Sequence, residues 1–194
     1  ENTLIVFSTD NGSAAGSSFF NAEMRGAKNS PYRGGTRVPS FWKWKSVLPE
    51  GIDVSHVTAH IDVLPTLCEL AGVDVPEAVE KKIEGRSLVP LLINQKADWP
   101  DRPLVTHQGR WKRGKAAENA YNNCRIREGR WSLVNTKNKP DAWELYDIDS
   151  DPSEEHDIAS EHQDVVHRLA TTYEKWWESV QPDLVNEDVD GPPE

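Results

Sequence analysis

A short continuous apolar run near the start of the chain most constrains how it can fold. Residues 3–8 read Thr-Leu-Ile-Val-Phe-Ser and lack the alternation of a strand with one wet face. Such a run is typical of a central strand in a parallel sheet, buried on both faces. It ends in a turn cluster at Thr9-Asp10-Asn11-Gly12. The pattern therefore predicts the α/β fold class.

The same run stands at the head of the chain with nothing that resembles a leader before it. No initiator Met, basic segment or apolar signal-peptide core precedes residue 3. Because a central strand needs neighbours on both sides, we expect that upstream sequence is absent here.

Charge and composition exclude several classes of protein. Lys plus Arg number 22 and Asp plus Glu number 32, which gives a net charge of −10. This balance argues against a nucleic-acid partner held by general phosphate attraction. No apolar stretch approaches the roughly 20 residues of a membrane span. Two cysteines, Cys68 and Cys124, are too few for a disulfide scaffold or a four-cysteine zinc site.

Residues 1–98 are expected to form one part of the fold. Residues 38–44 read as a second strand. A helical repeat begins at Ser55, a plausible N-cap, and stops at Gly72. Pro65 lies within that repeat and predicts a kink or a break. A short apolar helical turn follows at 87–93.

Residues 99–194 have a different texture, which predicts a second part. Four short strand candidates precede a helix expected over 161–180, and Glu128-Gly129 between two of the strands signals a hairpin. The acidic stretch over 141–164 is interpreted as a solvated face and helix entry. The strand candidates are residues 104–107, 122–127, 131–135 and 143–146.

Three residues near the start of the chain carry the chemistry. Asp10 and Asn11 offer a carboxylate and an amide oxygen at the end of a strand, where a divalent cation could bind. Lys28 lies in a Gly-rich basic segment over 12–37, and its ammonium could face an oxyanion. A plain turn and a flexible basic loop are the alternative readings. His107, beside Arg110 and Trp111, is a candidate substrate contact or else the end of a hairpin.

Taken together, these segments resemble the C-terminal half of a formylglycine-dependent, arylsulfatase-like sulfatase of the alkaline-phosphatase-like superfamily. The resemblance implies an α/β fold in which residues 1–98 end a mixed-sheet catalytic domain and residues 99–194 form a small four-stranded antiparallel sheet with a C-terminal helix. The matching segments are Phe7-Ser8-Thr9-Asp10-Asn11-Gly12, Lys28 with Tyr32-Arg33-Gly34-Gly35-Thr36-Arg37-Val38-Pro39, Asp62-Val63-Leu64-Pro65-Thr66-Leu67, Glu84-Gly85-Arg86-Ser87-Leu88, and Trp143-Glu144-Leu145-Tyr146-Asp147 with Asp151-Pro152-Ser153-Glu154.

The resemblance also implies roles and partners. Asp10 and Asn11 would bind the active-site divalent cation, usually Ca²⁺, and Lys28 would contact the sulfate group and assist catalysis. The substrate would be a sulfated small molecule or a sulfated glycan, hydrolysed at its sulfate ester. The family is typically exported to the periplasm or the extracellular space.

The chain departs from the family where the nucleophile is made. Formylglycine arises from the Cys or Ser of a C-x-P/A-S-R motif, and neither Cys68 nor Cys124 is followed by such residues. The Asp pair that completes the metal site is also missing. We therefore expect a C-terminal fragment, inactive alone, that holds part of the site. Arg33 stands where many members carry Glu.

Two alternatives remain open. One is a phosphodiesterase or phosphonate hydrolase of the same superfamily, because its charged substrate group has a similar size. The other is a non-catalytic glycan-binding module built on residues 99–194. The eight tryptophans of the chain and the segment 107–111 support this alternative.

Overall fold

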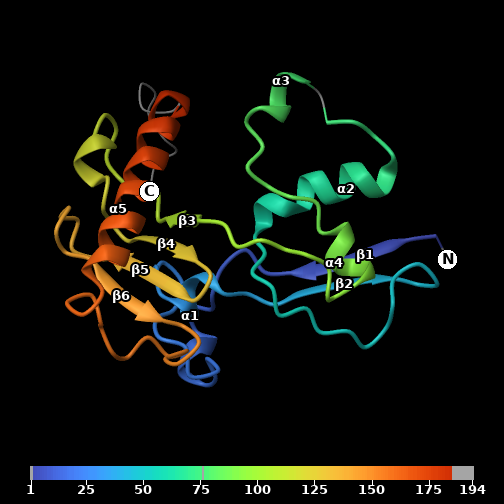
Figure 1. The fold of residues 1–194 in the computed structure, drawn as a ribbon, viewed down its shortest axis with the longest axis horizontal. Helices are drawn as coiled ribbons and strands as arrows, with labels where there is room; N and C mark the ends of the chain where they lie inside the picture. The colour runs from blue at the N-terminus through green and yellow to red at the C-terminus, as the bar shows by residue number, and fades with distance from the viewer. Residues whose placement is uncertain (1, 76, 185–194) are drawn as a thin grey trace. The chain divides into compact units, whose positions relative to one another are not determined.

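The computed structural model describes residues 2–75 and 77–184 (Figure 1). Its contacts divide the described residues into two compact units. The first unit combines residues of 1–8 with those of 39–101, and the second combines 9–38 with those of 102–194. The segment with Asp10, Asn11 and Lys28 thus belongs with the C-terminal sheet. The domain division at residues 98 and 99 stays a prediction for the protein as a whole.

The first unit contains a two-stranded antiparallel sheet of β1 (Leu4–Ser8) and β2 (Ser40–Trp44). The strand expected at 38–44 is confirmed, but the expectation of a buried central parallel strand is wrong for β1 within the described residues. Only β2 pairs with β1 there, so its side chains lack cover, and Ile5 and Phe7 are more than half exposed.

Helices of the first unit are short. A 3-10 helix η2 (His60–Asp62) leads into α2 (Val63–Ala71), and α3 (Glu77–Glu80) and α4 (Val89–Ile93) follow. The stop at Gly72 is confirmed, since Gly72 has a φ of 65°. The start at Ser55 is wrong because buried Asp62, which accepts the N–H of Ala59 at 2.8 Å, closes the entry turn instead. Pro65 lies in the first turn of α2, where its missing N–H costs nothing.

The second unit contains a four-stranded antiparallel sheet in the order β3-β4-β5-β6. The strands are β3 (Leu104–His107), β4 (Cys124–Glu128), β5 (Trp131–Asn135) and β6 (Glu144–Asp147), so the four predicted strands and the hairpin at Gly129 are confirmed. The predicted C-terminal helix is α5 (Gln163–Val180). The shorter helices are η1 (Gly16–Ser18), α1 (Arg33–Thr36), η3 (Ala117–Asn119) and η4 (Gln181–Asp183).

The two faces of this sheet are covered by different elements. On one face α5 packs over an apolar core (Figure 1) that includes Ile126, Leu133, Leu145, Leu169 and Tyr173, each fully buried. Residues one step along each strand point the other way, because side chains alternate across a sheet. That second face carries Arg125, Ser132, Val134, Glu144 and Tyr146, and the segment around Tyr32 packs on it.

Most tryptophans of the second unit contribute to its core. Trp143 and Trp177 are buried, and Trp111, Trp131 and Trp176 pack against the same cluster. These rings therefore stabilise the fold, and the alternative of a glycan-binding module stays a prediction. No helix of the described residues is long and apolar enough to cross a membrane.

Candidate functional site

The turn that carries Asp10 and Asn11 is joined to the glycine pair of α1. The N–H of Gly12 donates to the carbonyl of Gly35 at 3.0 Å. A Cβ at Gly12 would overlap the carbonyl of Gly34, so the two backbones can approach only because residue 12 is a glycine. The Asp10 carboxylate accepts the N–H of Asn11 at 3.0 Å, which fixes the start of the turn.

Lys28 belongs to the same loop assembly. Its N–H donates to the carbonyl of Ser13 at 3.2 Å, two residues beyond Asn11. The N–H of Gly34 donates to the carbonyl of Arg25 at 2.7 Å, and this bond closes the segment between Arg25 and Gly34 that contains Lys28. The structure thus brings the three sequence-predicted residues into one assembly, which we call the Lys28 loop (residues 9–37). The side chain of Lys28 is exposed, as a substrate contact requires.

Glu154 attaches the Lys28 loop to the sheet. One carboxylate oxygen accepts the N–H of Arg33 at 2.7 Å, and the other accepts the hydroxyl of Ser132 at 2.9 Å. The side chain of Glu154 is fully buried and lies 3.6 Å from the guanidinium of Arg125. The first turn of α1 is therefore held by a charged acceptor that belongs to the motif after β6.

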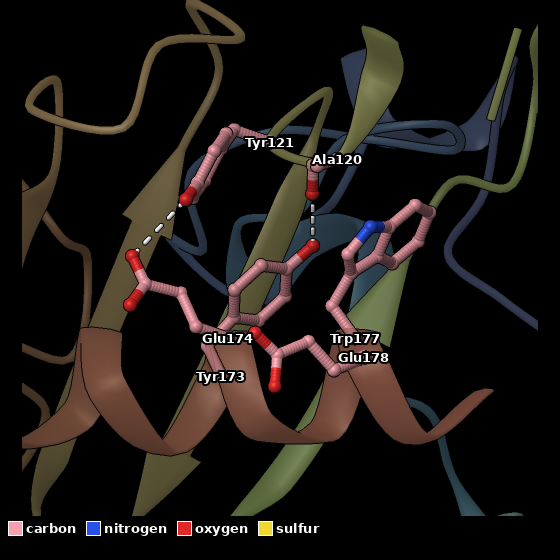
Figure 2. Close-up of a pocket in the computed structure, with 6 residues that line it drawn as sticks. All are labelled: Ala120, Tyr121, Tyr173, Glu174, Trp177 and Glu178. Atoms are coloured by element: carbon pink, nitrogen blue, oxygen red, sulfur yellow. Dashed lines mark hydrogen bonds between the residues drawn. The ribbon is translucent and has the colours of Figure 1, made fainter. Parts of the chain in front are cut away.

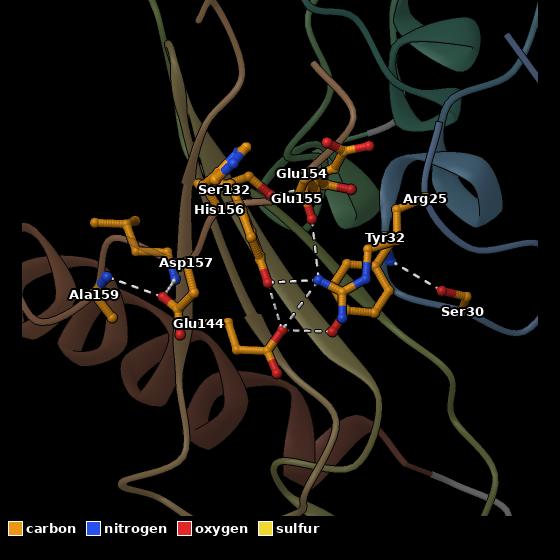
Figure 3. Close-up of polar contacts among 12 residues, drawn as sticks. Arg25, Ser30, Tyr32, Ser132, Glu144, Glu154, Glu155, His156, Asp157 and Ala159 are labelled. Carbon is orange, nitrogen blue, oxygen red and sulfur yellow. Dashed lines mark hydrogen bonds and ion pairs between the residues drawn. The ribbon is translucent and has the colours of Figure 1, made fainter. Parts of the chain in front are cut away.

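A second attachment lies around Glu144. Figure 3 shows Arg25 and Tyr32 of the loop directed at this carboxylate. The phenols of Tyr32 and Tyr146 donate to Glu144 at 2.5 and 2.7 Å. Arg25 donates to the Tyr146 oxygen at 2.7 Å, and its guanidinium lies 3.9 Å from the centre of the Tyr32 ring. Burial, and then the Glu144 carboxylate, raise the pKa of Tyr32 to about 12, so the phenol stays a donor at neutral pH.

The interpretation of residues 141–164 as a solvated acidic face is wrong at three positions. Glu154 is buried, Glu144 is half-buried beneath the loop, and Asp147 is 8% exposed. The carboxylate of Asp147 accepts hydrogen bonds from both Nε and Nη2 of Arg130. These hydrogen bonds hold the pKa of the Asp147 carboxyl well below the usual range. Each carboxylate accepts hydrogen bonds from other groups of the chain, and this is why its burial is tolerated.

His107 lies on the α5 side of the sheet, away from the Lys28 loop. Its ring stacks on Trp177 with 4.9 Å between centroids, Nδ1 accepts the N–H of Gly109, and Nε2 lies 3.1 Å from the carbonyl of Asn119. Burial lowers the pKa of His107, so the ring is neutral at pH 7. These contacts account for His107 as part of the core, and a contact with substrate stays a prediction.

A small cleft opens near the same helix (Figure 2). It has a volume of about 160 Å³ and is lined by α5 and by the segment at Ala120-Tyr121. Tyr121 donates to Glu174 at 3.0 Å, and Tyr173 donates to the carbonyl of Ala120. Its carboxylates, Glu174 and Glu178, would disfavour a sulfate group, so this cleft is a poor candidate for the sulfate site.

The donor set for a cation is chemically suitable but incomplete. Asp10 and Asn11 supply two hard oxygen donors of the kind that Ca²⁺ prefers. Ca²⁺ takes about 6–8 oxygen ligands. Within residues 2–75 and 77–184, no group of three or more His, Cys, Asp or Glu side chains could hold a metal ion. The chemistry of the two residues suits part of a cation site, and a complete site would need further ligands.

Sequence reasoning missed the residues that hold the Lys28 loop in place. Arg25 donates to the backbone carbonyl of Glu154 at 3.0 Å and lies 3.7 Å from the Glu144 carboxylate, to which Tyr32 donates, although more than 100 positions separate these partners in the sequence. A signal was available in the alternation of β4 to β6. Charged or polar residues on the face opposite the apolar core indicate that a polar segment covers that face.

Comparison with known proteins shows what the chain is similar to. Residues 27–179 match the model of the family described as N-sulphoglucosamine sulphohydrolase, C-terminal. An N-acetylglucosamine-6-O-sulfatase of Bacteroides thetaiotaomicron is 30% identical over 162 residues, which cover 81% of this chain and 26% of that protein. The steryl-sulfatase of Rattus norvegicus is 36% identical over 100 residues, covering 47% of this chain and 17% of that protein.

Solved structures show the same fold. The crystal structure of Ps i-CgsB aligns with a TM-score of 0.76 at 28% identity, over 90% of this chain and 36% of that one. The same protein has been solved in complex with k-i-k-neocarrahexaose, with the same TM-score. The chain thus spans between about a sixth and a little over a third of the length of these relatives.

Proposed function

Because the chain belongs to the N-sulphoglucosamine sulphohydrolase C-terminal family, the C-terminal part of sulfatases, we propose that it supplies one side of the active site of a sulfate-ester hydrolase. The observation that carries this proposal is the Lys28 loop. It gathers Asp10, Asn11 and Lys28 on one backbone assembly, held by Gly12, Gly34 and Gly35. Hydrolysis of a sulfate ester is the activity of the family, and these three residue types suit it.

Lys28 is proposed to bind the sulfate group. Its exposed ammonium can face the sulfuryl oxygens, where negative charge increases as the ester bond breaks. The same group can donate a proton to the leaving oxygen of the alcohol or phenol. The hydrogen-bonded backbone at Lys28 fixes the point from which its side chain extends, and a fixed origin of this kind helps to orient the ammonium towards the sulfate group.

Asp10 and Asn11 are proposed to hold a divalent cation, Ca²⁺ in the first place. When bound, the cation would stabilise negative charge on the sulfate group. The residues of this chain would orient it: the N–H of Asn11 binds one oxygen of Asp10 and leaves the other carboxylate oxygen and the Asn11 amide for the ion.

The nucleophile is proposed to be a formylglycine supplied by a part of the protein outside these residues. Neither Cys68 nor Cys124 has the required motif. Cys124 is also fully buried, and burial raises the pKa of its thiol to about 12, so it is a poor nucleophile at neutral pH. By this proposal the chain alone has no sulfatase activity.

The substrate class that we propose is a sulfated glycan. Two of the compared relatives support it, one by its name as an N-acetylglucosamine-6-O-sulfatase and one by its complex with a neocarrahexaose. A sulfated steroid is the other class suggested by a relative's name.

Cation binding tests the proposal in a longer protein that contains this chain and a C-x-P/A-S-R segment. Asp10→Ala should weaken Ca²⁺ binding measured by calorimetry and should lower the hydrolysis rate of an aryl sulfate, because a ligand and a compensating charge are lost. Asp141→Ala, which removes an exposed carboxylate elsewhere, serves as the control. Unchanged Ca²⁺ affinity in Asp10→Ala would contradict the proposal and would mean that Asp10-Asn11-Gly12 is an ordinary turn.

Activity of the separate chain provides a second test. The 194-residue chain should release no phenol from an aryl sulfate with added Ca²⁺, whereas the longer protein should. Turnover by the chain itself would contradict the assignment of the nucleophile to another segment. Hydrolysis of an aryl phosphate but not of the matching sulfate by the longer protein would favour the phosphodiesterase alternative.

A further inference from the structure

We propose that Glu154 is the positioning residue of the Lys28 loop, which it holds on the sheet so that Lys28 stays in register with Asp10 and Asn11. The catalytic part of this inference rests on the proposed function of Lys28. The positioning part rests on contacts in the second unit and can be tested separately.

The first step is the contact between Glu154 and α1. The carboxylate accepts the N–H of Arg33 at 2.7 Å, and this N–H is one of the first in α1, which no carbonyl within the helix can reach. Arg33 also donates through its side chain to the carbonyl of Pro152. Two bonds thus fix the N-terminus of a four-residue helix that could not be stable alone.

The second step leads from α1 to the predicted site residues. Gly35, in the same helix, accepts the N–H of Gly12, which follows Asn11. Gly34 binds the carbonyl of Arg25, and Lys28 binds the carbonyl of Ser13. A displacement of α1 would therefore reach both sides of the candidate site through bonds no more than three residues from Asn11 and Lys28.

The third step is electrostatic. Arg125 is 4% exposed on the sheet face beneath α1 and donates to the hydroxyl of Thr36 at 2.6 Å. Burial lowers the pKa of Arg125 to about 10, Glu154 opposes this shift, and Arg127 and Arg33 add to it. Glu154 is thus a carboxylate beside the guanidinium groups of Arg125 and Arg33, and its removal would take away the carboxylate that lies 3.6 Å from the buried charge of Arg125.

The loop anchor can be tested by hydrogen–deuterium exchange on the 194-residue chain. In Glu154→Gln, amide exchange of residues 27–36 should increase by at least about tenfold, as expected when a hydrogen bond to a charged group is lost. Exchange of α5, which packs on the opposite, apolar face of the sheet, should change little. Glu155→Gln is the matched control, since it makes the same change one residue away on an exposed side chain.

A shorter acid provides a second variant. Glu154→Asp keeps the charge near Arg125 but shortens the reach to the N–H of Arg33. Glu154→Asp should also increase amide exchange of residues 27–36. If far-UV circular dichroism shows that Glu154→Gln does not fold, Glu154→Asp takes its place in each experiment. If the amides of residues 27–36 exchange at the same rate in the Glu154 variant as in the Glu155→Gln control, the proposal is overturned.

Kinetics in the longer protein distinguish positioning from general stability. Glu154→Gln should lower kcat by about tenfold to a hundredfold, the cost of a small misplacement of a catalytic group. In a Lys28→Ala background the same change should lower kcat by a clearly smaller factor, because one of the residues whose register it sets is gone. Equal losses in both backgrounds would show that Glu154 does not act through Lys28 and would overturn the inference.

The two proposals can fail separately. If the longer parent protein hydrolyses no sulfate ester, the proposed function fails, and the exchange experiment alone decides whether Glu154 holds the loop. If the parent is active and Glu154→Gln matches Glu155→Gln in kcat and in exchange, the proposed function stands and the positioning role is refuted.

Discussion

The N–H of Gly12 donates to the carbonyl of Gly35 at 3.0 Å in a space that no side chain at position 12 could share. Gly12→Ala should therefore break this approach and detach the Asp10-Asn11 turn from α1. We expect a loss of about 1–3 kcal/mol in the free energy of unfolding, in the range of overpacked sites. Urea unfolding followed by circular dichroism measures this loss.

The control for this substitution lies in the same loop. At Gly16 an added methyl group would meet the Ser13 hydroxyl, which can rotate away at the cost of the hydrogen bond that it accepts from the Gly16 N–H, rather than a fixed backbone carbonyl. Gly16→Ala should change the free energy of unfolding by less than about 1 kcal/mol. Equal losses in the two variants would show that the close approach at Gly12 has no special cost.

The Tyr32 phenol provides a second prediction about how the loop is held. Tyr32→Phe removes a donor to the Glu144 carboxylate at 2.5 Å but keeps the ring that lies beneath Arg25. We expect a loss of about 1–3 kcal/mol, typical of a hydrogen bond to a charged group. Thermal unfolding of the chain measures it, and an unchanged midpoint would mean that Tyr146 alone satisfies Glu144.

The Asp147–Arg130 pair predicts a dependence of stability on pH. The folded-state pKa of Asp147 is held below its ordinary value of 3.8, chiefly by the hydrogen bond from Arg130. The stabilisation is therefore complete above about pH 4 and is lost as the pH falls towards the folded-state pKa. Asp147→Asn should be less stable than the parent at pH 7, and the difference should shrink below pH 4.

Urea unfolding at pH 7, 5, 4 and 3 checks this prediction. Asp149→Asn is the control, because Asp149 is an exposed carboxylate two residues away. That variant should follow the parent at each pH. A deficit of Asp147→Asn that stays constant from pH 7 to pH 3 would contradict the assignment to the Asp147 carboxylate.

The sequence predicts the second unit well because its signals are local. Each strand candidate between residues 104 and 147 alternates or ends at turn residues, and the helix at 163–180 has its own apolar stripe. The burial of β1 was mispredicted because it depends on what covers the strand rather than on its own residues. Within the described residues, β1 has one neighbour.

The candidate site divides in the same way. Asp10, Asn11 and Lys28 are predicted from residue type and from a resemblance in sequence, and their roles stay predictions. Glu144 and Glu154 were read as solvated acids because their donors, Tyr32 and the N–H of Arg33, lie more than 100 residues earlier in the chain. Local charge pattern carries no information on such partners, whereas burial opposite an apolar core does.

The last prediction concerns the chemistry of Lys28 in the longer protein. Lys28→Ala should leave the melting temperature nearly unchanged, because an exposed side chain contributes about 0.5 kcal/mol or less. Turnover of an aryl sulfate should fall by about a hundredfold or more, the usual loss when one stabiliser of transition-state charge is removed. Lys112→Ala, at an exposed lysine outside the loop, should keep the parent rate.

A series of aryl sulfates separates the two roles of this ammonium. If Lys28 protonates the leaving oxygen, the deficit of Lys28→Ala should shrink as the pKa of the phenol decreases, since good leaving groups need no proton. If the loss of rate in Lys28→Ala is the same for every phenol in the series, Lys28 stabilises charge but does not donate a proton. A Lys28→Ala enzyme as fast as its parent would refute both roles, because an ammonium that contacts sulfuryl oxygens cannot be removed without cost.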